Sequence, residues 1–181
     1  GEVKPEAMAR GVKLTALAFH VKALARALCD FPRFNASLTS DGERLVLKGY
    51  VHIGIAVDTE YGLMVPVIRE VNEKGLWQIA SEISDLAKRA QARKIKPEEM
   101  GGASMTITNL GGIGGTAFTP IVNPPEVAIL GLTRTEMTPV WNGEVFAPVP
   151  MVPLDLSYDH RVINGAEAAR FVAHLAGLIA D

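Results

Sequence analysis

The sequence predicts an α+β two-layer sandwich, in which a mixed β-sheet carries helices on one face. Three segments have helical spacing, and the strand-like segments between them come in groups. Strict strand-helix alternation is therefore absent, which disfavours a doubly wound fold or a barrel and favours helices gathered on one side of a sheet. The length of 181 residues and the hydrophobic content of 48% fit one domain with a substantial core.

Three helices are predicted from apolar residues that recur at steps of three and four. The first covers Lys13–Phe31, where Asp30 and Pro32 mark its end. The second covers Gly75–Lys94 and the third Gly165–Ala180. Cys29 falls in the first pattern, and we expect it to be a small buried apolar residue.

The strands of the first half follow from turn signals and apolar runs. Asp41-Gly42 predicts a hairpin between two short strands. The runs Val51–Val57 and Leu63–Ile68 then flank a turn at residues 59–62. Both runs are nearly continuous rather than alternating, so we expect strands that are buried on both faces.

The second half is predicted to contain more strands and one glycine-rich loop. A strand at Ala103–Leu110 leads into the loop Gly111–Gly115, and another strand lies in "EVAILGLTRT". A hairpin turns at Asn142-Gly143 and continues as one long strand toward Asp159.

The composition argues against several classes of function. The net charge is −2 without a run of Lys or Arg, which disfavours a nucleic-acid or anionic-membrane partner. No apolar run approaches the ~20 residues of a transmembrane helix, and the charged first residues do not resemble a signal peptide. The single cysteine excludes an internal disulfide and a cysteine metal cluster, and a reducing compartment is expected. No His/Glu spacing suits a metal.

The four histidines differ in context. His20 and His174 lie in helix patterns and His52 in a strand, so we expect structural roles for them, with His20 and His174 at the surface or on helix flanks. His160 ends a strand just before a turn, where a side chain can reach a cleft. The residues alone leave open whether His160 is a catalytic base or structural.

The neighbours of His160 are expected to hold its turn rather than to complete a triad. Asp159 and Arg161 are adjacent to it, and adjacent strand residues point to opposite faces. We therefore expect ion pairs or backbone hydrogen bonds from this pair.

Other catalytic motifs are missing from the sequence. The glycine-rich loop after Thr108 has neither the lysine of a Walker loop nor the glycine spacing of a Rossmann loop. Two interpretations of its glycines remain: a tight connection, or a place where a ligand or another chain approaches the backbone closely. No G-x-S-x-G elbow exists. A catalytic His160 would therefore activate a group that the substrate brings.

Several motifs together resemble one family. "LSYDHRVINGAEAARF", "VHIGIAVDTEYGLMVPVIR", "MTITNLGGIGGTAFTPIVNPPEVAILGL" and "PVWNGEVF" resemble the dihydrolipoamide acyltransferases, in the order of that family and over nearly the whole chain. These proteins form the core of 2-oxoacid dehydrogenase complexes. "HRVING" and "FTPIVNPPEVAILG" look most like the pyruvate-specific bacterial branch. The resemblance implies the fold of chloramphenicol acetyltransferase, acetyl transfer between S-acetyldihydrolipoamide and coenzyme A, and a bacterial cytoplasmic location.

The resemblance also implies roles for single residues. His160 matches the base that deprotonates the coenzyme A thiol, and Thr108 matches the hydroxyl donor to the oxyanion. Asn164 matches a position where many members have Asp, so it is expected to act by hydrogen bonding. Substrate contacts are predicted along the loop 58–64 and the segment 111–119, with these cofactor-binding residues: Asp58, Gly62, Met64, Gly111, Gly112 and Phe118. Coenzyme A and lipoamide are the implied substrates, with no metal.

The same resemblance implies an assembly. Residues 1–181 correspond to the catalytic domain, and we expect its N-terminal start and the lipoyl and subunit-binding domains to lie outside this chain. The implied unit is a homotrimer within a larger cubic or icosahedral core. His160 and Thr108, 52 residues apart in the sequence, would meet across a subunit interface. The 2-oxoacid dehydrogenase and dihydrolipoamide dehydrogenase components would bind through the absent domains.

Three alternatives remain at this stage. The first is a succinyl- or branched-chain-specific acyltransferase of the same family. The second is a stand-alone acetyltransferase of the chloramphenicol type. The third is a catalytically weak assembly core, against which the presence of both His160 and Thr108 argues.

Overall fold

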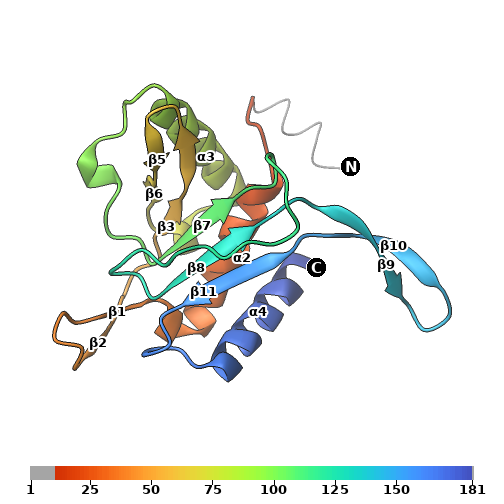
Figure 1. Ribbon diagram of the computed structural model, residues 1–181. Helices are drawn as coiled ribbons and strands as arrows, with labels where there is room; N and C mark the ends of the chain where they lie inside the picture. Colours follow the sequence, from red (N-terminus) through yellow and green to blue (C-terminus); the bar gives the residue numbers. More distant parts are fainter. Residues whose placement is uncertain (1–10, 181) are drawn as a thin grey trace.

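The computed structural model describes residues 11–180 and arranges them as a sheet with helices packed on one side (Figure 1). The sheet has five strands in the order β11-β8-β7-β3-β6. Their bounds are β3 (Ile53–Ile55), β6 (Val67–Ile68), β7 (Met105–Asn109), β8 (Ala128–Leu132) and β11 (Leu154–Tyr158). The central strands β3, β7 and β8 are parallel, whereas β6 and β11 pair antiparallel at the edges. The predicted mixed sheet is therefore confirmed.

All three predicted helices are present, and α2 (Ala16–Asp30) lies between the other two. It contacts both α3 (Leu76–Gln91) and α4 (Gly165–Ala180). The apolar stripe of α2 is fully buried, and it forms one core cluster with the inward side chains of the sheet. Residues 11–180 also contain three short 3-10 turns: η1 (Pro32–Phe34), η2 (Val71–Glu73) and η3 (Pro97–Glu99).

The prediction for Cys29 was wrong, because its side chain is exposed. The buried stripe of α2 runs through Val21, Leu24 and Leu28. One residue beyond Leu28 is a rotation of about 100° around a helix, which turns Cys29 away from the core. Its apolar neighbours in the sequence therefore did not indicate its burial.

The alternation of β7 gives the sheet two different faces. Met105 and Ile107 belong to the core cluster beneath the helices. Thr106 and Thr108 point to the opposite face, where they line a cavity. The face without helices is thus the one that presents hydroxyl groups.

Three hairpins lie outside the main sheet. Each is a separate two-stranded sheet, and the pairs are β1 (Ala36–Leu38) with β2 (Leu45–Leu47), β4 (Val57–Thr59) with β5 (Gly62–Met64), and β9 (Glu136–Trp141) with β10 (Phe146–Met151). The first and last confirm the turns predicted at Asp41-Gly42 and Asn142-Gly143.

Two strand predictions need correction. The runs 51–57 and 63–68 are not two long buried strands: β3 and β6 are buried, but β4 and β5 leave the sheet as a hairpin on which Leu63 is exposed. The long strand toward Asp159 is also divided, into β10 and β11. Pro153 lies at that break, and proline has no N–H to continue a ladder.

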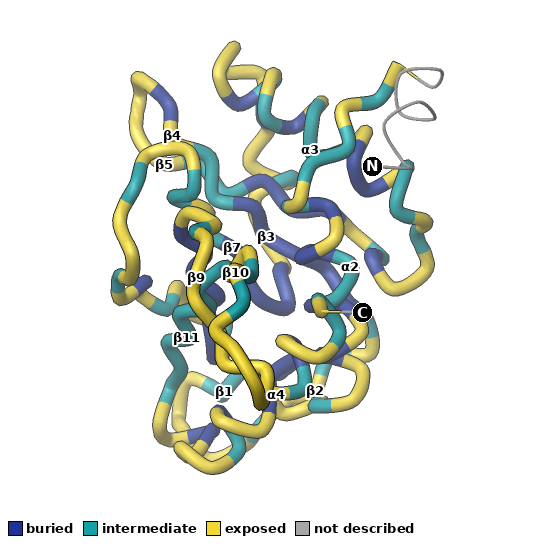
Figure 2. The backbone as a smooth tube through the Cα atoms, turned by 90° about the vertical axis from the view of Figure 1, so that its right-hand side faces the viewer, coloured by how far each residue is buried: buried dark blue, intermediate teal, exposed yellow. Residues whose placement is uncertain are grey.

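The β9–β10 hairpin projects from the body of the molecule (Figure 1), and most of it is exposed (Figure 2). Trp141 and Phe146 meet edge to face at its tip, with ring centroids 5.2 Å apart. These two side chains are 56% and 69% exposed. We call residues 136–151 the arm. Among the helices of the described chain, none is long and apolar enough to cross a membrane.

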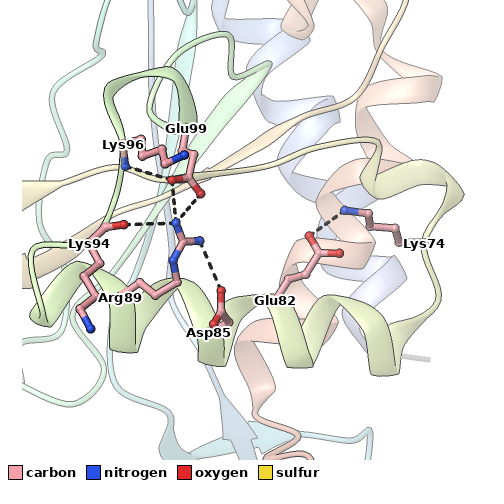
Figure 3. A network of polar contacts seen from close by, with 7 residues as sticks. All are labelled: Lys74, Glu82, Asp85, Arg89, Lys94, Lys96 and Glu99. Atoms are coloured by element: carbon pink, nitrogen blue, oxygen red, sulfur yellow. Dashed lines mark hydrogen bonds and ion pairs between the residues drawn. The ribbon is translucent and has the colours of Figure 1, made fainter.

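A charged network fastens the loop after α3 back onto that helix (Figure 3). Arg89 donates to both carboxylate oxygens of Glu99, at 2.7 and 2.6 Å, and also pairs with Asp85 at 3.4 Å. The N–H of Lys96 donates to Glu99 at 2.9 Å. The Arg89 hydrogen bonds, followed by the Lys96 N–H, lower the pKa of Glu99.

Replacing Arg89 by Met should destabilise the protein in a pH-dependent way. A carboxylate whose pKa is lowered by folding stabilises the native state above its unfolded pKa, about 4.3, and this contribution is lost as the pH falls through the folded value. The gap in unfolding free energy between wild type and Arg89→Met should thus be complete at pH 7 and shrink below about pH 4. Denaturant unfolding across this pH range measures it.

Arg134→Met is the matched control. Its pair with Glu136 is exposed and joins residues only two apart in the sequence, so little change is expected. If the difference in unfolding free energy between wild type and Arg89→Met stayed constant with pH, this would contradict the role given to Glu99.

Candidate active site

A cavity of about 540 Å³ lies on the face of the sheet that carries no helices. Its floor includes Thr106 and Thr108 of β7 and Ile129 of β8. Its outer wall comes from residues 116–127, which contain neither helix nor strand and which we call the cover segment. Leu63 and Val65 border it beside the β4–β5 hairpin. The lining is mostly apolar, and the hydroxyl of Thr108 is one of its few polar groups.

Phe118 enters the cavity over a glycine. Thr108, Gly131 and Asp155 are partners in register across β7, β8 and β11. A Cβ atom on Gly131 would lie only 2.7 Å from Cζ of Phe118. The N–H of Phe118 donates to Asp155 Oδ2 at 3.3 Å, which holds the start of the cover segment over this position. The ring can therefore lie beside Thr108 because residue 131 has no side chain.

His160 lies on an exposed turn directly after β11. The predicted bracing by its neighbours is confirmed: Arg161 Nη2 lies 2.7 Å from Asp159 Oδ2, and the Arg161 N–H donates to Asp159 Oδ1 at 3.0 Å. The Asp159 carbonyl accepts from two further N–H groups, those of Val162 and Ile163. The Arg161 hydrogen bonds lower the pKa of Asp159. The imidazole of His160 is thus presented to solvent by a rigid turn, with the Tyr158 ring 5.6 Å away.

Asn164 caps the helix that follows this turn. Its Oδ1 accepts from the Glu167 N–H at 2.9 Å, and Glu167 Oε2 accepts from the Asn164 N–H at 3.2 Å. This reciprocal pair is a capping box. These two hydrogen bonds of Asn164 lie at the start of α4 and do not involve His160.

Thr108 and His160 lie at opposite ends of the sheet within one chain. Thr108 is in register with Asp155, five residues before His160 and two strands away. Strand geometry puts this at about 10 Å across the sheet and about 16 Å along it. One chain therefore does not bring the two candidate catalytic groups together.

The six predicted substrate-contact residues fall in three places. Phe118 lines the cavity beside Thr108. Gly111 and Gly112 border a smaller cavity of about 210 Å³ next to His20. Asp58, Gly62 and Met64 lie on the β4–β5 hairpin, where Met64 packs toward the core. Within the described part of one chain they do not form a single site.

The remaining histidines have structural surroundings. His52 Nδ1 accepts from the Glu70 N–H at 3.0 Å, and His174 lies 3.1 Å from Asp30. The expectation that His20 lies at the surface or on a helix flank was wrong, because α2 buries it, and burial lowers its pKa. Residues 11–180 contain no cluster of three or more His, Cys, Asp or Glu that could hold a metal.

Sequence reasoning missed Thr106 and Glu126. Thr106 Oγ1 donates to Glu126 Oε1 at 2.9 Å, and burial raises the pKa of Glu126. The one signal in the sequence was that Glu126 is a single acidic residue between Pro125 and an apolar strand. This position does not by itself indicate which residue Glu126 contacts. The sequence did not indicate the roles of Gly54 and Gly131 either, since a glycine in a strand shows only that another group approaches closely and not which group it is.

Adding a methyl group at Gly131 should test the seat of Phe118. Gly131→Ala forces the ring or the strand to move and should lower the unfolding free energy by roughly 1–3 kcal/mol. Gly177→Ala adds the same methyl group to α4, where nothing lies within 4 Å, and should be neutral or stabilising. Denaturant unfolding compares the two, and equal stability of Gly131→Ala and wild type would contradict the described contact.

The fold defines the class of protein first. The chain superposes on chloramphenicol acetyltransferase with a TM-score of 0.58 at 15% identity, over 98% of this chain and 82% of that one. This likeness establishes the fold alone, and it confirms the predicted fold class.

The sequence then establishes the family. Residues 1–181 match the family of the 2-oxoacid dehydrogenases acyltransferase (catalytic domain). The chain therefore belongs to this family, as the motifs predicted.

Relatives in the family are similar over most of this chain. The dihydrolipoyllysine-residue acetyltransferase components of the pyruvate dehydrogenase complexes of Azotobacter vinelandii and Haemophilus influenzae are 57% and 52% identical, each over 94% of this chain. The chain spans only 27% and 30% of their lengths.

Two solved structures have a TM-score of 0.98, and each match covers 99% of this chain and 74% of the other. One, 56% identical, is the cubic core of the pyruvate dehydrogenase multienzyme complex. The other, 55% identical, belongs to a study of a serine, a histidine and an asparagine in the catalytic mechanism of Azotobacter vinelandii dihydrolipoamide acetyltransferase.

Proposed function

We propose that this chain transfers an acetyl group between S-acetyldihydrolipoamide and coenzyme A, as the core component of a pyruvate dehydrogenase complex. The observation that carries the proposal is the spacing of its candidate groups. In the Azotobacter protein the serine lies 52 residues before the histidine and the asparagine four residues after it. Thr108, His160 and Asn164 have the same spacing here, and threonine supplies the same hydroxyl donor as serine.

The proposed reaction needs no nucleophile from the protein. His160 takes the proton of the coenzyme A thiol, whose pKa near 8.5 is within reach of an imidazole. The thiolate forms a new carbon–sulfur bond to the carbonyl carbon of S-acetyldihydrolipoamide, and the carbonyl oxygen becomes an oxyanion. Collapse breaks the original carbon–sulfur bond, and the departing dihydrolipoyl sulfur takes the proton back from His160.

Thr108 is suited to stabilise that oxyanion. Its hydroxyl faces a largely apolar cavity, where a hydrogen bond to a developing charge is worth more than in water. Asn164 supports the base indirectly, because its capping box fixes the junction between the His160 turn and α4. No role at Asn164 requires a carboxylate charge.

Assembly would supply the missing half of each site. Because Thr108 and His160 lie at opposite ends of one sheet, a complete site requires Thr108 from one subunit and His160 from another. The arm begins four residues after β8, at the Thr108 end, and exposes Trp141 and Phe146. A neighbouring copy that packed against the arm would bury these rings. We therefore propose a homotrimer within a larger core, consistent with the cubic core of the relative.

Lipoamide and coenzyme A are proposed to enter this site from opposite sides, past Phe118 and past the loops that carry Asp58, Gly62, Met64, Gly111 and Gly112. The proposed partners of the whole protein are the 2-oxoacid dehydrogenase and dihydrolipoamide dehydrogenase components. The proposed location is the bacterial cytoplasm, where the thiol substrates stay reduced.

Competition among acyl donors tests the function directly. With acetyl-, succinyl- and isobutyryl-CoA offered together to dihydrolipoamide, the acetyl product should predominate. The lining beside Thr108 contains no cationic side chain among its residues, so a succinyl carboxylate would be buried unpaired. Predominance of succinyl or branched product would replace the proposed specificity, and no transfer at all would favour the assembly-core alternative.

Subunit mixing tests the shared site. Thr108→Ala should lower kcat by ~10²-fold, and His160→Ala should lower it at least as far. Mixed trimers of the two variants should regain about a quarter of the wild-type activity, because each interface takes its Thr108 and its His160 from randomly chosen subunits and about one interface in four receives both intact. Trimers made only of the Thr108→Ala/His160→Ala double variant are the control, and their activity should stay at the level of the single variants or below. Failure of the two single variants to complement each other would place both groups in one chain.

A further inference from the structure

The cover segment is attached to the sheet by side chains at both of its ends. At its start, Thr133 Oγ1 donates to the Thr116 carbonyl at 3.3 Å, and the Phe118 N–H donates to Asp155. Near its end, Thr106 Oγ1 donates to Glu126 Oε1 at 2.9 Å. The residues between these points, including Pro120 and Val122, form the cavity wall. The Asp159 N–H also donates to the Val127 carbonyl at 2.8 Å. Because the segment has no strand or helix of its own, these bonds together help to set how far it stands from the sheet.

Thr106 connects this attachment to the proposed oxyanion donor. It lies two residues before Thr108 on the same face of β7, and both line the cavity. Thr106 is only 2% exposed, and its bond to Glu126 is part-buried. A shift of the Glu126 end would therefore change the width of the cavity directly beside Thr108.

Gly54 is the third part of this arrangement. It pairs with Thr106 in register across β3 and β7. A Cβ atom on Gly54 would lie 2.5 Å from Thr106 Oγ1 and 3.4 Å from its Cβ. The hydroxyl of Thr106 can take its observed position only because residue 54 lacks a side chain.

Glu126 has few other partners. Its Oε2 is buried and accepts no hydrogen bond from the described residues. Lys48 is the basic group that acts on it electrostatically, but the Lys48 ammonium donates to the Ala103 carbonyl at 2.8 Å. Burial raises the pKa of Glu126 and lowers that of Lys48. A carboxyl group held in such an environment has an energetic cost.

We propose that Glu126 is a positioning residue for the acyl-transfer site: through Thr106, and with the space left by Gly54, it holds the cover segment at the distance that keeps the cavity open beside Thr108. This inference rests on the proposed function, because it assigns the cavity to a thioester substrate. Neither Glu126 nor Thr106 touches the reacting atoms, so both act through the position of the wall.

Thr106→Val tests the inference, because it replaces only the hydroxyl by a methyl group. The variant should raise the KM for at least one of the two thiol substrates about tenfold, the effect of losing one buried hydrogen bond, while kcat changes less than about twofold. Thr106→Ser restores the donor and should have wild-type KM values. Glu126→Ala should match Thr106→Val, and combining the two should add little, since they remove one interaction.

Hydrogen exchange supplies a readout that does not depend on activity. Amides of residues 118–127 should exchange faster in Thr106→Val than in Thr106→Ser. Gly54→Ala should reproduce the Thr106→Val effects on KM and exchange, whereas Gly49→Ala, with nothing within 4 Å of the added atom, should match wild type.

The outcomes separate this inference from the proposed function. An active Thr106→Val variant with unchanged KM values overturns the inference, whether or not exchange is faster, and leaves the proposed function standing. A wild-type protein without transfer overturns the proposed function and, with it, the positioning role. A raised KM in Thr106→Val that Thr106→Ser also shows would overturn the role of the hydroxyl.

Discussion

The strand β7 imposes the constraint on which the rest of the structure depends. Its alternate residues must satisfy two different environments, because the helices cover only one face of the sheet. Met105 and Ile107 join the aliphatic core beneath α2, and this burial fixes the register of the central strands. The same register places Thr106 and Thr108 on the other face. A shift by one residue would bury the hydroxyls in the core and expose the apolar side chains, so stability and site geometry are secured together.

The open face is shaped by an irregular segment and not by a second layer of helices. Such a segment has no strand ladder along its length, and it is held by side-chain contacts from the strands below and by the Asp159 N–H, which donates to the Val127 carbonyl. Two strand glycines make these contacts possible: Gly131 leaves room for Phe118, and Gly54 leaves room for the hydroxyl of Thr106. The shape of the cavity beside Thr108 thus depends on the absence of side chains at Gly54 and Gly131 as well as on the residues that line it.

The two ends of the sheet divide the proposed chemistry. Thr108 lies near the C-terminal end of β7, whereas the antiparallel β11 carries His160 to the other end. The turn at His160 is braced by Asp159 and Arg161, and Asn164 caps the helix behind it, so the backbone that carries the imidazole is held independently of Thr108. Within one chain this geometry keeps the two candidate groups apart, and the arm begins at the Thr108 end.

The sequence by itself determined the three helices, the two hairpins at Asp-Gly and Asn-Gly, the mixed sheet and the family, because each depends on local periodicity, turn chemistry or short motifs in order. Through the resemblance it also proposed His160, Thr108 and Asn164 as candidate site residues, and it predicted the bracing role of Asp159 and Arg161. Only the tertiary structure decided that Cys29 is exposed, that β4 and β5 leave the sheet, and that the six predicted contact residues lie in three places. It alone revealed the bond between Thr106 and Glu126, since this contact joins residues 20 apart through a folded segment. Local patterns report which face of an element is apolar, but which side chains meet across the open face depends on the path of the chain in three dimensions.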